Sequence, residues 1–299
     1  MNARIKDYVL VAKPGMVAAN LVTAAGGFFL GARGSIDMTL LISTVIGISL
    51  VVASACAFNN CIDRDIDRRM RRTRNRALAR GLISPVAVVA CASLMGIAGS
   101  TLLLTAAGEL CLAVVLAGFA VYVFVYSLYL KRNSVHAVVI GSLAGAAPPL
   151  AGYCAAGGRF DTGALILLAI FVSWQIPHSW AIALHRSDDY ASAAIPVLPL
   201  RRGIACARRH IIGSIVFFMA SAFTLTLCGY TGYRCLAVVA LFSLSWLCLA
   251  LSGGYVHHDR LWAKRLFVFS VVTILVLSIM ISIDSTTPPA SPILLSLNP

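Results

Sequence analysis

The sequence predicts an all-α, polytopic membrane protein, built as a bundle of about nine transmembrane helices. Three observations support this prediction. The chain of 299 residues is 60% hydrophobic, and its mean hydropathy is +0.89. Only 12% of its residues are charged, whereas soluble domains carry about 25%. Apolar runs of about 20 residues, the length that crosses a bilayer, fill most of the chain.

The apolar runs delimit nine expected spans, and the loops between them alternate between the two sides of the membrane. These spans run near residues 15–32, 39–59, 84–106, 110–130, 135–156, 163–184, 210–229, 234–253 and 265–283. Because the spans follow one another closely, we expect residues 1–284 to form a single transmembrane domain. Residues 285–299, which include Pro288, Pro289 and Pro292, are predicted to be a disordered tail.

Basic residues are distributed unequally between the two sets of loops. Of the 24 lysines and arginines, only Arg33, Arg159 and Arg234 fall on one side. Loops rich in Lys and Arg stay in the cytoplasm, so we expect the N-terminus and the loops 60–83 and 185–209 there. The N-terminal segment is too short for a signal peptide and carries an acidic residue, so a bacterial inner membrane is the expected location.

The net charge of +13 does not indicate a nucleic-acid partner. The basic residues lie in short loops, where they orient the chain and meet anionic lipid or phosphate. No soluble module is present that could read a nucleic-acid groove. The nine cysteines are scattered through apolar runs without a Cys-x-x-Cys pair, which favours packing over disulfides or a metal cluster.

The most charged segment begins where the second span ends. Three of the 11 acidic residues lie between residues 63 and 67, and eight arginines lie between residues 64 and 80. If the end of the span is helical, Asn60, Asp63 and Asp67 share one face at i, i+3 and i+7, whereas Asp65 points elsewhere. Two carboxylates and an amide, ringed by arginine at the mouth of an apolar bundle, predict a site for a divalent metal and a phosphorylated ligand.

A second pair of acids, Asp188 and Asp189, follows the sixth span at the same membrane depth. The two acidic loops can therefore face each other across one cytoplasmic mouth. Mg²⁺ binds through a few carboxylates together with phosphate oxygens and water. We expect Asp63, Asp67 and Asp189 to meet Mg²⁺ through a diphosphate, and Asn60 and Asp188 to complete the catalytic group.

The candidate phosphate ligands are Arg74, Arg76, Lys131 and Arg132, because guanidinium forks match phosphate oxygens. Arg74 and Lys131 are favoured because they lie at the rim of the site. For most other basic residues, membrane orientation is a sufficient explanation.

Aromatic and imidazole side chains supply the remaining candidates. Three tyrosines late in the fourth span recur at i, i+4 and i+7 and form either an aromatic wall or ordinary packing: Tyr122, Tyr126 and Tyr129. In the sixth span Trp174, His178 and His185 recur at i, i+4 and i+11. A histidine inside an apolar span is costly without a partner, which makes His178 a functional candidate, although a satisfied packing histidine is the alternative. In the fifth span Pro148-Pro149 predicts a broken or bent helix that either lines a cavity or only packs.

These motifs resemble those of the UbiA-type intramembrane prenyltransferases. Asn60-x-x-Asp63-x-x-x-Asp67, followed by arginines, is similar to the first aspartate motif of that family. Further stretches, in the same order, resemble its haem branch, the protohaem IX farnesyltransferases: Lys13-Pro14-Gly15, Asn59-Asn60-Cys61-Ile62-Asp63-Arg64-Asp65-Ile66-Asp67, Arg72-Thr73-Arg74-Asn75-Arg76, Tyr126-x-x-x-Leu130-Lys131-Arg132, Gly145-Ala146-Ala147-Pro148-Pro149, Trp174-Gln175-Ile176-Pro177-His178 and Asp189-Tyr190.

The resemblance implies a nine-helix bundle that uses Mg²⁺ to bind farnesyl diphosphate. It implies transfer of the farnesyl group to a vinyl group of haem b, with addition of water, giving haem O and diphosphate. It also implies that Arg74, Lys131, Arg132, Tyr126 and Trp174 contact the substrates. His178 would orient the haem, either as an axial ligand or through a propionate. Besides membrane lipids, a haem A synthase or a terminal oxidase is an expected assembly partner.

One departure separates this chain from many UbiA relatives. Their second motif is Asp-x-x-x-Asp, whereas here only Asp188-Asp189 occurs, with His185 and Ser192 at the flanking places. That pattern fits the haem branch. Two alternatives stay open at this point: a related enzyme with an aromatic quinone-precursor acceptor, and a non-enzymatic transporter.

Overall fold

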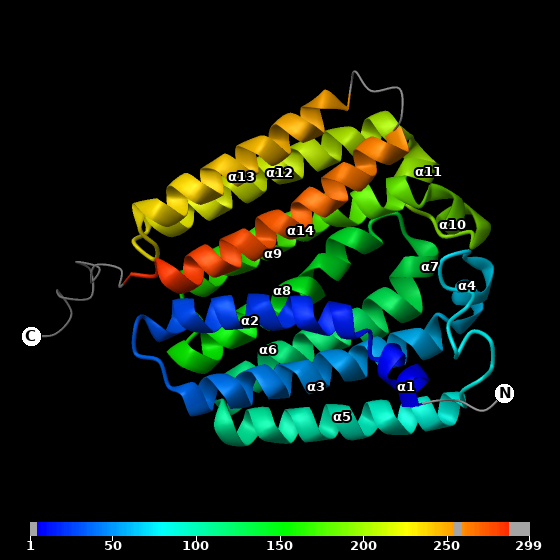
Figure 1. The fold of residues 1–299 in the computed structure, drawn as a ribbon, viewed down its shortest axis with the longest axis horizontal. Helices are drawn as coiled ribbons and strands as arrows, with labels where there is room; N and C mark the ends of the chain where they lie inside the picture. The colour runs from blue at the N-terminus through cyan, green and yellow to red at the C-terminus, as the bar shows by residue number, and fades with distance from the viewer. Residues whose placement is uncertain (1–4, 254–258, 287–299) are drawn as a thin grey trace, which may run out of the picture.

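Long helices that run side by side along one axis make up the chain (Figure 1). The computed structural model describes residues 5–253 and 259–286, and within them nine helical segments are long and apolar enough to cross a membrane. They are α2 (Pro14–Ala32), α3 (Met38–Ile62), α5 (Pro85–Ala106), the segment Gly108–Asn133, α8 (Ala137–Gly157), α9 (Thr162–His185), α12 (Ile204–Leu227), α13 (Tyr233–Ser252) and α14 (Asp259–Ile283). The predicted all-α class and the nine spans are confirmed, and the chain is a multi-pass membrane protein.

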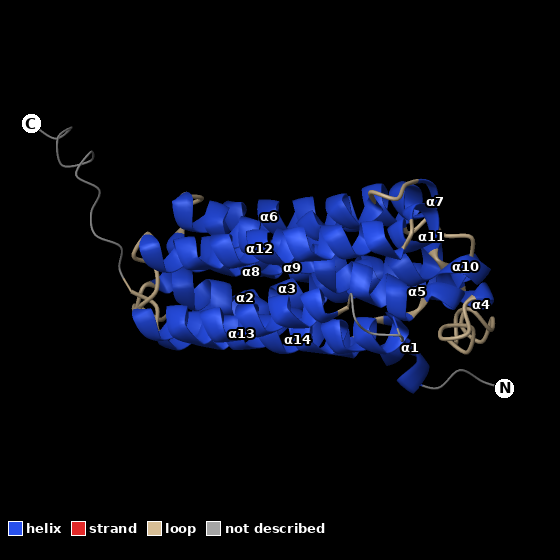
Figure 2. Cartoon of the chain, turned by 90° about the horizontal axis from the view of Figure 1, so that it is seen from above, coloured by secondary structure: helices blue, strands red, loops and turns tan. Residues whose placement is uncertain are grey.

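The short helices gather at one end of the bundle, which we call the charged end (Figure 2). They are α1 (Ile5–Val11), α4 (Arg64–Arg69), α7 (Lys131–Asn133), α10 (Ser187–Ser192) and α11 (Leu198–Arg202). The charged end thus brings together the segments after α3 and α9, which carry the candidate site residues Asp63, Asp67, Asp188 and Asp189. The turns at the opposite end are shorter, and only Ala107 separates α5 from α6 (Gly108–Ala120).

Two spans begin six residues earlier than the hydropathy pattern predicts. α12 begins at Ile204 and α14 at Asp259, because both helices extend past the apolar run with one buried face. In α14 Trp262 is buried, whereas Lys264 is exposed on the other side. Such an amphipathic extension keeps its charges in water while its apolar side packs, so mean hydropathy misses it.

The fourth span changes helix type near the charged end. α6 continues into a π-helix, η1 (Val121–Leu130), before α7. Tyr122 and Tyr126 stack with ring centroids 5.9 Å apart, but Tyr129 is 65% exposed. The predicted three-tyrosine wall is therefore wrong for Tyr129. A π turn contains more residues than an α turn, so positions seven apart no longer share a face.

Glycines bring α2 and α8 into backbone contact. A Cβ atom at Gly27 would overlap the carbonyl oxygen of Pro149, and one at Gly152 would overlap that of Ala24. α8 continues through Pro148 and Pro149, so of the two predicted outcomes, a broken or a bent helix, the break is wrong. Small residues let two helices approach closely, and here neighbouring packing stabilises the segment around the prolines.

Ser285 and Thr286, the first two residues of the predicted C-terminal tail, make contacts with the rest of the chain. Ser285 pairs with Thr231 in an isolated bridge, and the Thr286 hydroxyl donates to the carbonyl of Gly229 at 2.7 Å. The first two residues of the predicted tail are thus held against the turn between α12 and α13. The rest of it, from residue 287, lies outside the described residues.

Candidate active site

The end of α3 places two carboxylates inside the charged end. α3 stops at Ile62, and Asp63 leaves helical geometry with φ −87° and ψ 7°. The helical hydrogen-bond pattern nevertheless continues through this residue. The Asp63 amide donates to the Asn59 carbonyl, and the Asp67 amide donates to the Asp63 carbonyl. Asp63 and Asp67 are consequently both buried, although acidic side chains rarely are unless they are paired. Asp65 is 52% exposed, as its position on another face predicts.

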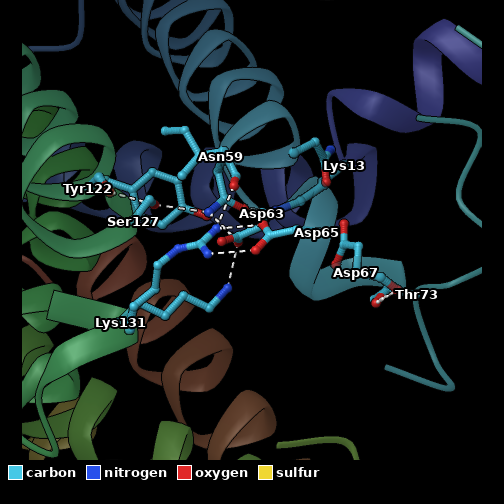
Figure 3. A network of polar contacts seen from close by, with 12 residues as sticks. Lys13, Asn59, Asp63, Asp65, Asp67, Thr73, Tyr122, Ser127 and Lys131 are labelled. Atoms are coloured by element: carbon cyan, nitrogen blue, oxygen red, sulfur yellow. Dashed lines mark hydrogen bonds and ion pairs between the residues drawn. The ribbon is translucent and has the colours of Figure 1, made fainter. Parts of the chain in front are cut away.

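Asp63 is the centre of a buried polar cluster that joins three spans (Figure 3). Its Oδ2 accepts from Lys131 Nζ at 2.5 Å and from Asn59 Nδ2 at 2.8 Å. Asn59 Oδ1 in turn accepts from Lys13 Nζ at 2.5 Å. Asn59 Nδ2 also donates to Ser127 Oγ at 2.9 Å, so η1 is tied to α3. We call Lys13, Asn59, Asp63, Ser127 and Lys131 the Asp63 cluster.

One oxygen of Asp63 has no partner. Oδ1 is buried and accepts no hydrogen bond within the described residues. A buried carboxylate oxygen normally has a donor, because leaving it unsatisfied is costly. Carboxylate oxygens are also the ligands that Mg²⁺ prefers, so the donor chemistry of Asp63 fits that ion.

Asp67 is paired with an arginine from the following loop. Arg76 Nη1 donates to Asp67 Oδ2 at 2.8 Å and to Asn60 Oδ1 at 3.0 Å. Asn60 Nδ2 donates to the Val11 carbonyl at 2.6 Å, so Asn60 connects the loop to α1 and is not bonded to Asp63. Arg74, which the sequence favoured, is exposed. Of the two arginines, Arg76 is the one that the structure brings to the predicted aspartates.

Arg132 is turned toward Asp65. Its guanidinium contacts both Asp65 oxygens at 2.7 Å and also donates to the Ile62 carbonyl. These hydrogen bonds hold the pKa of Asp65 down at about 2. The pair connects α7 to the end of α3. Because Arg132 contacts Asp65, Lys131 is the basic residue of α7 that contacts Asp63.

The second acidic loop contacts the first, as predicted from their common depth. Asp189 Oδ1 accepts from the Arg71 amide at 2.9 Å, and Ser192 Oγ donates to the Arg69 carbonyl at 3.1 Å. Asp188 instead pairs with Arg260 at 2.6 Å, where both side chains are largely exposed. Of the two adjacent acids, Asp189 therefore faces the Asp67 loop.

Tyr190 packs beside this contact against the small cluster around Ile66 and Met70. Burial raises the pKa of Tyr190 to about 12, so it is a neutral hydroxyl at physiological pH. The two acidic loops are thus joined by apolar packing as well as by hydrogen bonds.

The aspartates do not form a complete metal cage of their own. Within residues 5–253 and 259–286, no three His, Cys, Asp or Glu side chains lie close enough together to hold an ion. A cation bound at Asp63, Asp67 or Asp189 would take further ligands from outside the chain. Mg²⁺ does this where it bridges one or two carboxylates and substrate phosphates.

The sixth-span candidates lie against α14. Trp174 stacks on His178 with centroids 4.7 Å apart, and His178 Nδ1 lies 2.8 Å from Ser270 Oγ. Trp174 Nε1 donates to the Ser270 carbonyl at 2.8 Å. His185 Nδ1 lies 3.2 Å from the Arg260 carbonyl oxygen. The structure thus brings Trp174 and His178 together and does not join them to the Asp63 cluster by hydrogen bonds.

Comparison with known proteins identifies the family to which this chain is similar. The UbiA prenyltransferase family matches residues 20–280. A protoheme IX farnesyltransferase from Photorhabdus laumondii is 55% identical over 284 residues, which cover 95% of this chain and 97% of the relative. A second, from Edwardsiella ictaluri, is 53% identical over 292 residues, which cover 98% and 99% of the two chains.

Solved structures share the architecture at low sequence identity. A digeranylgeranylglyceryl phosphate synthase aligns with a TM-score of 0.77 at 15% identity, over 94% of this chain and 98% of the other. A UbiA homologue from Archaeoglobus fulgidus, bound to GPP and Mg²⁺, aligns with a TM-score of 0.67 at 17% identity, over 93% and 100%. From the match over most of its length and from its near full-length relatives, the chain belongs to the UbiA prenyltransferase family.

Proposed function

We propose that this chain transfers the farnesyl group of farnesyl diphosphate to a vinyl group of haem b, giving haem O and diphosphate. The observation that carries the proposal is the buried Asp63 at the mouth of an apolar helical bundle. One of its oxygens is paired to Lys131, and the other accepts no hydrogen bond from the residues that the structure describes. Relatives named protoheme IX farnesyltransferase, 53–55% identical over nearly the whole chain, support haem as the acceptor over an aromatic quinone precursor.

The charged end provides a site for the diphosphate. Lys131 and Lys13 point into the Asp63 cluster, and Arg76 extends to Asp67. Asp63 and Asp67, with Asp189 from the second loop, would hold Mg²⁺, which would supply positive charge to offset that of the diphosphate. The UbiA homologue structures with a prenyl diphosphate and Mg²⁺ support that use of the ion.

The bond changes follow from this arrangement. The bond between farnesyl C1 and oxygen breaks, and diphosphate leaves with the electron pair. Lysine and arginine groups stabilise this growing charge more than they stabilise the bound substrate, which lowers the barrier. The vinyl π electrons bond to C1, water adds to the resulting cation beside the porphyrin ring, and the water loses a proton.

The apolar part of the bundle suits both reactants. A farnesyl chain and a porphyrin dissolve among apolar helices, and an allylic cation survives only where water is excluded. Tyr122 and Tyr126, which stack near Ser127, offer π faces close to the Asp63 cluster. A cation is attracted to such faces.

We place the enzyme in a bacterial inner membrane, with the charged end in the cytoplasm. The excess of basic residues at that end supports this orientation. Haem A synthase or a terminal oxidase, which use the product, would be assembly partners. Membrane lipids surround the spans.

Purified protein in detergent tests the proposal directly. Incubation with farnesyl diphosphate, haem b and Mg²⁺ should yield haem O, identified by mass, and one diphosphate per haem O. Omitting Mg²⁺ should abolish both products. Transfer to a hydroxybenzoate but not to haem would contradict the proposed acceptor, and release of no diphosphate would favour a transporter.

A further inference from the structure

His178 of α9 is held in a defined orientation by α14. Its ring stacks on Trp174, and its centroid lies 5.1 Å from that of Phe267. Nδ1 lies 2.8 Å from Ser270 Oγ, and Ser270 is fully buried. The Trp174 indole is itself anchored on the Ser270 carbonyl. One residue of α14 thus orients both rings.

Counting protons assigns the tautomer of His178. Ser270 Oγ also lies 2.6 Å from the Phe267 carbonyl oxygen, which can only accept. A serine hydroxyl has a single proton, so Ser270 donates it to Phe267 and must accept from His178. The proton of the neutral imidazole is therefore on Nδ1, and Nε2 carries a free lone pair.

The free nitrogen is open to a ligand. Nε2 makes no hydrogen bond to the described residues, and it is not among the buried nitrogens that lack a partner, so it is accessible. His178 lies seven residues before the end of α9, about 10 Å inside the bundle. Histidines that bind metal typically donate the other ring N–H to a fixed acceptor, which sets their tautomer. Ser270 provides such an acceptor.

We propose that His178 binds the iron of the haem acceptor through Nε2, with Ser270 as the positioning residue that fixes the imidazole. Trp174 and Phe267 supply flat apolar surface beside the coordinated ring. The inference rests on the proposed function, since haem is the acceptor there. It selects iron coordination over a propionate contact, because a propionate would need a proton on Nε2.

Resonance Raman spectroscopy of the purified chain with ferrous haem b tests the coordination. The wild type should show an iron–histidine stretching band, and His178→Ala should lose it. Added imidazole should restore axial coordination in His178→Gly. Metal-free protoporphyrin IX should bind the wild type and His178→Ala equally well, which shows that the variant is folded. Absence of the band in the wild type, or its persistence in His178→Ala, would overturn the proposal.

Ser270→Ala tests the positioning role. It should shift the iron–histidine band and weaken haem affinity about tenfold or more, because the imidazole N–H loses its acceptor. Ser278→Ala is the matched control, since among the described residues that buried hydroxyl of α14 bonds only to the Ile274 carbonyl, at 2.8 Å. It should leave the band unchanged. An unshifted band in Ser270→Ala would refute the role of Ser270.

The two proposals fail in different ways. An iron–histidine band without haem O formation would contradict the proposed function and leave the coordination standing. Haem O formation without the band would contradict the coordination alone.

Discussion

Lys131 forms an ion pair with Asp63, which precedes it by 68 residues, with 2.5 Å between Nζ and Oδ2. Both side chains are largely buried, at 17% and 3% exposure. The pair therefore joins the end of the fourth span to the end of the second inside the charged end. Because the same oxygen also accepts from Asn59, Asp63 is oriented before any substrate arrives.

Removing Lys131 should destabilise the protein through Asp63. Lys131→Met leaves a buried carboxylate without a cation, which is expected to lower the free energy of unfolding by about 3–5 kcal/mol. In an Asp63→Asn background the same change should cost much less. Unfolding of the purified variants in detergent measures both. Equal losses in the two backgrounds would contradict the coupling.

The two buried aspartates should be essential for transfer, whereas their exposed neighbour should not. Asp63→Asn or Asp67→Asn, like the corresponding alanine variants, is expected to reduce haem O formation by at least about 100-fold, because diphosphate charge is then less stabilised. Asp65→Asn is the control, since it breaks only an exposed ion pair worth at most about 1 kcal/mol. Near-normal product from Asp63→Asn membranes would refute the assignment.

Arg76 and Arg74 provide a paired comparison. Arg76→Gln removes the cation that contacts Asp67 and Asn60, so kcat/KM for farnesyl diphosphate should fall about 10- to 100-fold. Arg74→Gln changes an exposed residue and should have a smaller effect. The reverse order would support Arg74, as the sequence predicted, as the principal phosphate ligand.

Hydropathy and helical spacing predicted the parts of this protein that depend on regular structure. Apolar runs located the spans, since a bilayer demands about 20 apolar residues per crossing. The i, i+3, i+7 spacing predicted that Asp63 and Asp67, but not Asp65, turn inward. The sequence already favoured Asp189 over Asp188 at the metal, and the structure adds the contacts that distinguish them: Asp189 accepts from the Arg71 amide, whereas Asp188 pairs with Arg260.

The side-chain contacts near irregular backbone could not be predicted from the sequence. α3 ends at Ile62, so Asn59, four residues before Asp63, is its partner, and Asn60 turns toward Arg76. No periodicity distinguishes Arg76 from Arg74 in a loop. The sequence carries no signal for Ser127, because a π-helix has no clear hydropathy signature. Lys13 precedes the first span in the motif Lys13-Pro14-Gly15, which was a usable signal for its position.

Lys13 should make substrate capture sensitive to alkaline pH. Burial lowers the pKa of Lys13 from 10.5 to about 8, so the free enzyme loses this charge as the pH rises through about 8. The value of kcat/KM for farnesyl diphosphate, which reports the free enzyme, should then fall. Lys13→Arg should keep its activity to higher pH, because arginine stays charged.

The free energy of unfolding should rise with pH, whereas kcat/KM should fall. The pKa of Lys13 is lower in the folded than in the unfolded chain, so the unfolded state binds more protons between about pH 8 and 10.5. The free energy of unfolding should rise with pH in that window relative to Lys13→Met.

The kinetic prediction has its own test. A pH profile of kcat/KM that is identical in wild type and Lys13→Arg would contradict the titration of Lys13 in the site.

The contact between α2 and α8 should tolerate no side chain. Gly27→Ala places a methyl group where the Pro149 carbonyl lies, so the free energy of unfolding should fall by about 1–3 kcal/mol or more. Gly213→Ala is the control, because that helical glycine has open space around it. Its free energy of unfolding should rise by up to about 1 kcal/mol.

The same contact should also affect activity. Since α2 begins directly after Lys13 and α8 follows the helix that carries Lys131, separating the two spans also moves both lysines. Gly27→Ala should therefore lower haem O formation at temperatures where the variant remains folded, and unchanged activity there would show that the lysines are positioned independently of this contact.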